Sequence, residues 1–220
     1  MKKVVLGILI VMFVVPAFAA VSQVVIDGRV RINIPVPDGF VDVTKTAPRV
    51  TSFFQETDTT NRVLAVLLST EDAQSEDPEL HRYLVIKVSP SVESHRITPR
   101  NFVEVRNYMR DQVTIDEMFE SAGEELNQQL DKMGIQIGEM KYVPFDSESE
   151  KHIGISFLMN ASAEVEGKRV DRIVASSFAM ILAKERMFNI YVYSGYYAAD
   201  DLIWTQNVLK NWAGAIIKAN

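Results

Sequence analysis

Cysteine is absent from this chain of 220 residues, and histidine occurs only three times. Without cysteine the chain has no disulfide, no thiol nucleophile and no thiolate ligand for a structural zinc site. The three histidines, His81, His95 and His152, are scattered singly, with no second histidine at the spacing of a metal-binding pair. We therefore expect no metal site, and packing alone must stabilise the fold.

The sequence also lacks the common catalytic and nucleotide-binding motifs. It has no Gly-x-Ser-x-Gly elbow, no Walker loop and no glycine-rich dinucleotide fingerprint. The adjacent carboxylates at 116–117 and 124–125 fall on a predicted helix, where neighbouring positions do not face each other. We expect no catalytic residue and no cofactor. A hydrolase site assembled in space from distant residues remains an alternative.

Long apolar runs are missing except at the start of the chain. Met1-Lys2-Lys3 is basic, residues 4–15 are apolar, and Pro16 precedes Ala17-Phe18-Ala19. This layout is typical of a secretory signal peptide over residues 1–19, with cleavage after Ala19. The alternative is an uncleaved anchor, but the run is shorter than the roughly 20 residues that span a bilayer. We expect a bacterial protein, periplasmic or secreted, whose mature chain has no transmembrane segment.

Loss of residues 1–19 makes the chain more acidic. The formal net charge moves from −6 to −8, because this segment holds two lysines and no acid. An acidic chain is a poor candidate for nucleic-acid binding, so we expect no nucleic-acid partner. Residues 20–220 are long enough to bury one good core, and we expect a single α+β domain there.

Residues 151–194 are the most regular stretch of the sequence. Apolar residues alternate with small or polar ones, which is the period of a β-strand. Gly167 marks a turn at 166–167, and Lys184-Glu185 marks a second two-residue turn. We predict a C-terminal meander of three antiparallel strands, in which residues 170–182 form the middle strand.

Two-residue turns at both places would sort the side chains of this meander by size. One face carries the bulky set, namely Ile155, Phe157, Met159, Val174, Phe178, Tyr191 and Tyr193. The other face is rich in small residues and consists of Gly154, Ser156, Ala175, Ser177, Ala179, Ile181, Phe188 and Ile190. A slip of one residue in either turn would exchange the faces.

Three longer helices are predicted to cover the sheet. A C-terminal amphipathic helix over about 199–218 has an apolar stripe at helical spacing: Leu202, Val208, Leu209, Trp212, Ala213 and Ile216. Two mid-chain helices begin at Thr98, followed by Pro99, and at Thr114, with Glu117 completing a capping box. Their predicted core faces are Phe102, Val105, Met109 and Val113, and then Met118, Phe119, Ala122, Leu126 and Leu130. Gly134 is expected to end the second.

The N-terminal half adds further strands to the antiparallel sheet. Asp27-Gly28 predicts a hairpin between residues 22–26 and 29–34, and residues 40–43 form a short continuation. Residues 49–56 read as a short helix, with a strand as the alternative. Residues 61–70 and 82–89 are predicted strands. The acidic segment 71–79 between them is a solvated loop or, alternatively, a calcium site.

The segment Arg31-Ile32-Asn33-Ile34-Pro35-Val36-Pro37-Asp38-Gly39-Phe40 carries a resemblance to a known family. Together with the order of elements, it resembles the PsbP-like fold, including exported bacterial proteins of the DcrB type. In that family an Ile-x-x-Pro-x-Gly-aromatic segment often opens the domain. The resemblance implies a binding or accessory domain without shared catalytic residues, so it assigns no functional residue here.

One aromatic concentration remains as a candidate binding surface. Tyrosines 191, 193, 196 and 197 and Trp204 crowd the last strand and the start of the last helix. The predicted register places Phe157, Ser176, Tyr191 and Tyr193 on one patch, which is either core or a groove. We expect a non-catalytic accessory or binding protein that acts through a protein or envelope partner. A small-ligand binder that uses this patch, or a periplasmic hydrolase, is the alternative.

Overall fold

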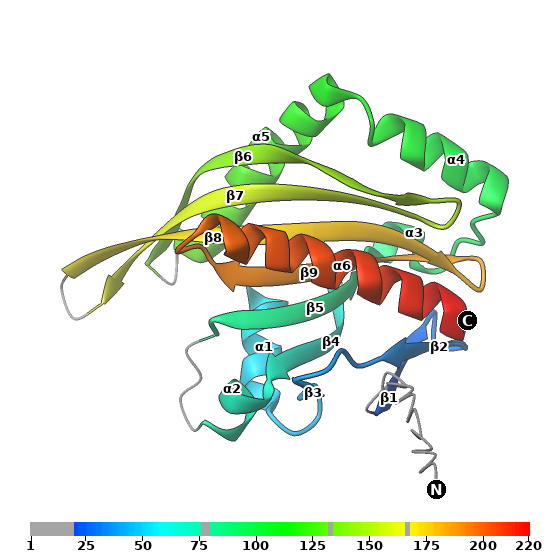
Figure 1. Ribbon diagram of the computed structural model, residues 1–220, viewed down its shortest axis with the longest axis horizontal. Coiled ribbons are helices and arrows are strands. Elements are labelled where there is room, and N and C mark those ends of the chain that lie inside the picture. Colours follow the sequence, from blue (N-terminus) through cyan, green and yellow to red (C-terminus); the bar gives the residue numbers. More distant parts are fainter. Residues whose placement is uncertain (1–19, 76–79, 132–133, 166–167) are drawn as a thin grey trace, which may run out of the picture.

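The computed structural model describes residues 20–75, 80–131, 134–165 and 168–220. The fold is α+β, with helices packed on antiparallel sheets (Figure 1). The predicted signal peptide and the turn at 166–167 lie outside these residues. Within them, no helix is long and apolar enough to cross a membrane.

The helices and strands alternate irregularly along the chain. Their bounds are β1 (Val21–Ile26), β2 (Val30–Pro35), β3 (Phe40–Asp42), α1 (Pro48–Glu56), β4 (Arg62–Ser69), α2 (Thr70–Gln74), β5 (Arg82–Val88), α3 (Pro90–Glu93), α4 (Pro99–Tyr108), α5 (Gln112–Leu130), β6 (Ile135–Ser149), β7 (His152–Val165), β8 (Lys168–Ala183), β9 (Arg186–Gly195) and α6 (Ala199–Ala219). The prediction of a helix rather than a strand at α1 is confirmed.

Seven strands form the main sheet in the order β3-β4-β5-β9-β8-β7-β6, and β1 pairs with β2 alone. The predicted three-strand meander is formed by β7, β8 and β9, and the sheet continues beyond it, because β6 pairs with β7 along most of its length. The alternation of inward and outward residues in β6 is hidden in the sequence. The pairing of β6 with β7 shifts register between Ile137 and Met140 and again between Val143 and Ser147. Bulges of this kind break the period of two.

The predicted register of the meander strands β7, β8 and β9 is confirmed. Phe178 pairs with Ile155 on β7 and with Tyr191 on β9. Ser176 likewise lies between Phe157 and Tyr193. Strand β8 is the middle strand of this group, as its two apolar faces indicate.

Helix α6 covers the face of small residues, crossing in front of β8 and β9 (Figure 1). The Ser177 hydroxyl lies 2.8 Å from that of Thr205 in the helix, and both are fully buried. Trp212 Nε1 donates a 2.8 Å hydrogen bond to the Pro35 carbonyl and so joins the helix to β2. Short side chains on the strands permit this close approach.

The opposite face is covered by α1 at one side and by α4 and α5 at the other. Thr98 caps α4 as predicted, accepting a hydrogen bond from the Asn101 amide. The predicted cap at Thr114 is wrong, because α5 begins at Gln112 and the Ile115 amide already donates to the Asp111 carbonyl. Asp111 and Thr114 are both residue types that favour helix starts, so local sequence did not separate them. The side chains of Val113, Phe119, Ala122 and Leu126 lie outside the described ones.

The turn of the first hairpin and the acidic segment 71–79 both differ from the expected form. The hairpin of β1 and β2 has a three-residue turn, since Ile26 pairs with Val30 and Arg29 lies outside the strand. Asp27 and Gly28 both have positive φ, at 53° and 62°. Part of the acidic segment forms the helix α2, where Asp72 contacts its own cap Ser69. Residues 76–79 of that segment lie outside the described residues.

We predict that Gly154→Val lowers the free energy of unfolding by about 1–3 kcal/mol. A Cβ at Gly154 would lie 3.1 Å from Leu209 Cδ2, 3.2 Å from Ser147 Cβ and 3.3 Å from the Phe178 carbonyl. Urea unfolding measures the change. Gly214→Ala is the control, because no atom lies within 4 Å there and helix propensity favours alanine by up to about 1 kcal/mol. Equal stability of Gly154→Val and the wild type would contradict this packing.

Candidate functional site

A cavity of about 410 Å³ lies against the sheet face opposite α6. Its walls are strands β5 to β9, helices α1 and α5, and the loop that joins α1 to β4. The described lining residues are Phe53, Phe54, Thr57, Asp58, Thr60, Asn61, Tyr83, Met118, Leu130, Ile135, Ile137, Met140, Ile155, Phe157, Met159, Ala161, Val174, Phe178, Tyr191 and Tyr193. Most are apolar, and the polar side chains other than tyrosine all come from the loop.

A row of aromatic rings forms one wall of this cavity. Tyr83 stacks on Tyr193 with ring centroids 4.7 Å apart, and Tyr193 stacks on Tyr191 at 6.0 Å. Phe178 continues the row at 5.2 Å from Tyr191, and Phe54 of α1 joins its other end at 5.1 Å from Tyr83. The row arises because Tyr83 pairs with Tyr193 across β5 and β9, and Phe178 pairs with Tyr191 across β8 and β9.

The aromatic patch predicted from the sequence is partly brought together here. Phe157, Tyr191 and Tyr193 line the cavity. Ser176 is fully buried and does not line it. Its hydroxyl faces the Tyr193 phenol without making a hydrogen bond of standard geometry. The patch is thus neither plain core nor an open groove, but the wall of a hollow.

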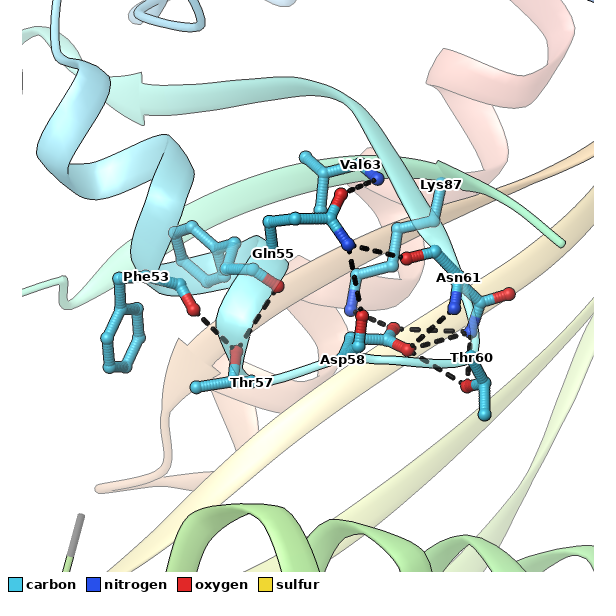
Figure 2. A network of polar contacts seen from close by, with 9 residues as sticks. Phe53, Gln55, Thr57, Asp58, Thr60, Asn61, Val63 and Lys87 are labelled. Carbon is cyan, nitrogen blue, oxygen red and sulfur yellow. Dashed lines mark hydrogen bonds and ion pairs between the residues drawn. The ribbon is translucent and has the colours of Figure 1, made fainter. Parts of the chain in front are cut away.

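The loop at residues 57–61 supplies the polar end of the cavity and is held by its own hydrogen bonds (Figure 2). Gln55 Nε2 donates to the carbonyls of Asp58 and Asn61, while Gln55 Oε1 accepts from the Val63 amide. The Thr57 hydroxyl donates to the Phe53 carbonyl at 2.9 Å. These bonds fix the loop before any ligand is present.

Lys87 and Asp58 form an ion pair behind this loop, with Lys87 Nζ 2.6 Å from Asp58 Oδ2 (Figure 2). The two side chains are only 11% and 12% exposed. Burial alone would raise the pKa of Asp58, but the Lys87 ammonium and hydrogen bonds from Lys87, Thr60 and Asn61 hold that pKa below its ordinary value. The Asp58 carboxylate is therefore charged, and it is paired with Lys87 and hydrogen-bonded by Thr60 and Asn61.

The tyrosines of the row are neutral. Burial raises the pKa of Tyr83, Tyr191 and Tyr193, and the nearby Asp58 carboxylate adds to the effect at Tyr191 and Tyr193. Neutral phenols act as hydrogen-bond donors and apolar surface, not as bases. The arrangement can hold a mostly apolar molecule, with polar contacts available at one end.

A contact between histidine and serine exists elsewhere. His152 Nδ1 lies 2.7 Å from the Ser149 hydroxyl, and His152 Nε2 lies 3.3 Å from that of Ser147. Burial lowers the pKa of His152, a change that Glu148 opposes and Lys210 reinforces, so the neutral ring is favoured. Neither His152 nor the two serines line the cavity. This contact therefore does not place a histidine and a serine in the cavity, as the hydrolase alternative would require.

Of the carboxylates noted in the sequence, Asp116 and Glu124 line a second hollow, of about 380 Å³, between α5 and β6. Glu120 and Glu139 line it as well. In the part of the chain that the structure describes, no three histidine, aspartate or glutamate side chains are grouped so as to hold a metal ion.

Sequence reasoning missed Tyr83, Lys87 and Asp58. Lys87 carried a signal, because it is the lone charge in the apolar run at 84–88 of β5. A charge that a strand buries needs a partner. Nothing in the sequence indicated that the partner would be Asp58, which is 29 positions away.

Comparisons with known proteins add little. No family model matches the chain, and no curated protein matches it. Among solved structures, a mutant of the protein Mog1 has a TM-score of 0.34 and 11% identity, covering 91% of this chain and 93% of that chain. A likeness this weak carries no argument, and the resemblance to PsbP-like proteins stays a prediction.

We predict that Lys87→Met lowers the free energy of unfolding by about 3–5 kcal/mol, because it leaves the Asp58 charge buried and unpaired. Chemical unfolding monitored by circular dichroism measures this. The control is the double variant Lys87→Met/Asp58→Asn, which removes both charges and should recover a large part of the loss. If Lys87→Met alone costs less than about 1 kcal/mol, the pair is screened as a surface pair would be.

Proposed function

We propose that the mature chain is an exported, non-catalytic binding domain that takes a small, mostly apolar molecule into the cavity between α1, α5 and the sheet. The cavity itself is the observation that carries this proposal. Its volume of about 410 Å³ lies within the roughly 300–1,000 Å³ of small-molecule sites, which are likewise apolar with a few placed polar groups.

The rim of the cavity supports access from solvent. Phe53 and Thr60 line the cavity and are both exposed. The loop between them is already ordered by Gln55 and Thr57, so a ligand would not have to organise it. Preorganisation reduces the entropy lost on binding.

A binding role fits the cavity chemistry better than catalysis. The Thr57 hydroxyl donates to the Phe53 carbonyl, and the Thr60 hydroxyl donates to Asp58 Oδ1. The Asp58 carboxylate is paired with Lys87, and the tyrosines are neutral. None of these described groups is poised as a nucleophile with a base beside it.

Action through a protein or envelope partner remains a second proposal. The tyrosine-rich end of the chain favours such a partner, but Tyr191 and Tyr193 of this group line the cavity. Tyr197 lies just before α6 and is 74% exposed, so it is the ring of this group that favours a partner contact. The cavity therefore supports ligand binding more strongly than the exposed ring supports a protein partner.

We predict that Val174→Trp abolishes binding of the hydrophobic fluorophore N-phenyl-1-naphthylamine. Val174 lines the cavity, so an indole there would occupy the space for a ligand. The enhancement of probe fluorescence measures binding. The matched control is Ile173→Trp, one residue away on the other face and 43% exposed, which should bind as the wild type does. Equal binding by Val174→Trp, or no binding by the wild type, would contradict the proposal.

Export is tested separately. When the full chain is expressed in a bacterial host with two membranes, intact mass spectrometry of the periplasmic fraction should find a protein that begins at Ala20. Retention of residues 1–19 in a membrane fraction would favour the uncleaved anchor instead.

A further inference from the structure

We infer that the ligand of this cavity is a free single-chain amphiphile, with a flexible aliphatic chain and an uncharged polar end such as a hydroxyl. This inference rests on the proposed function and names its ligand class. Three observations carry it: the stacking of the rings on one another, the aliphatic part of the cavity wall, and the charge balance at the polar end.

The rings of the row are already stacked on one another. Tyr193 stacks with Tyr83 and with Tyr191, at interplanar angles of 19° and 8°. Tyr191 also stacks with Phe178, at 26°. A planar aromatic ligand gains most by stacking on a ring face. Because each of the two inner rings already stacks with two neighbours, such a ligand has little advantage here.

Much of the remaining wall of the cavity is aliphatic and adaptable. Met118 of α5, Met140 of β6 and Met159 of β7 line it, together with Leu130 and Ile137. Unbranched thioether side chains adjust to irregular and flexible shapes better than branched ones do. This wall suits a chain that bends more than it suits a rigid plate.

The volume fits a chain of moderate length. A cavity of about 150 Å³ holds the six carbons of benzene. By that measure a cavity of about 410 Å³ has room for roughly sixteen carbon atoms, enough for a twelve-carbon chain with its polar end. A twelve-carbon chain is therefore the appropriate probe.

The polar end disfavours a charged head group. Asp58 is the one acid among the described lining residues, and Lys87 neutralises it. A carboxylate head would meet the Asp58 charge, and an ammonium head would meet Lys87 with no free acid beside it. Desolvating a charge without a partner is costly. Hydroxyls and amides of Thr60 and Asn61 can instead serve an uncharged end.

The test is a titration of the mature chain, labelled with ¹³C at its methionine methyl groups, with 1-dodecanol. We expect shifts at Met118, Met140 and Met159, which line the cavity, and none at Met109, which is buried at the C-terminal end of α4 and does not line it. Dodecanoate, dodecylammonium and the planar 9-phenanthrol are titrated in parallel. Each should bind at least about tenfold more weakly than dodecanol.

Each other outcome overturns the inference in a distinct way. Tighter binding of 9-phenanthrol would keep the proposed function and reject the aliphatic chain. Tighter binding of either ion would reject the uncharged end. Shifts with phosphatidylcholine vesicles as large as those with dodecanol would reject a free ligand in favour of membrane lipid. If N-phenyl-1-naphthylamine binds but no twelve-carbon probe does, the ligand class alone is wrong.

A variant tests the electrostatic step by itself. Asp58→Asn keeps the shape of the side chain and leaves the Lys87 ammonium unpaired. The affinity for dodecanoate relative to dodecanol should then rise by about tenfold or more. An unchanged ratio would show that the ion pair does not set the preference for an uncharged end.

Discussion

The hairpin turn at Lys184 and Glu185 is the constraint on which the rest of the structure depends. Both residues have positive φ, at 47° and 58°, which side chains with a Cβ adopt at a cost. Neighbours hold them there, since the Glu185 carbonyl accepts from the Ile97 amide and Lys184 Nζ donates to the Arg31 carbonyl. The turn sets the pairing of Ala183 with Arg186 and hence every pair along β8 and β9.

Because of that register, the two faces of β8 pack against different partners. Small residues on one face let α6 approach until Ser177 and Thr205 touch. On the other face, the large aromatic side chains project far from the sheet, so a helix cannot pack closely along the whole of β8 and β9. On this face α1 packs on β4 and α5 packs on β6, to either side of β8 and β9. The cavity occupies the space that they leave over β8 and β9.

The ion pair of Lys87 and Asp58 shows how the sheet and the cavity are linked. A lysine in a central strand of an apolar face destabilises the fold unless a carboxylate reaches it. The loop at residues 57–61 provides that carboxylate and at the same time forms the polar end of the cavity. Stability of the strand and shape of the site therefore depend on the same contact, and Lys87 also lies 5.3 Å from the Tyr191 ring centroid.

What the sequence by itself determined is local. The period of two and the short turns placed Phe157, Tyr191 and Tyr193 on one face, and the stripe of α6 placed Trp212 in the core. The longest edge strand, β6, escaped prediction because its bulges break that period. Tertiary structure alone decided that the rings border a hollow and that Asp58 meets Lys87. A cavity is a volume between elements distant in the chain, and no pattern within one element encodes the distance between two.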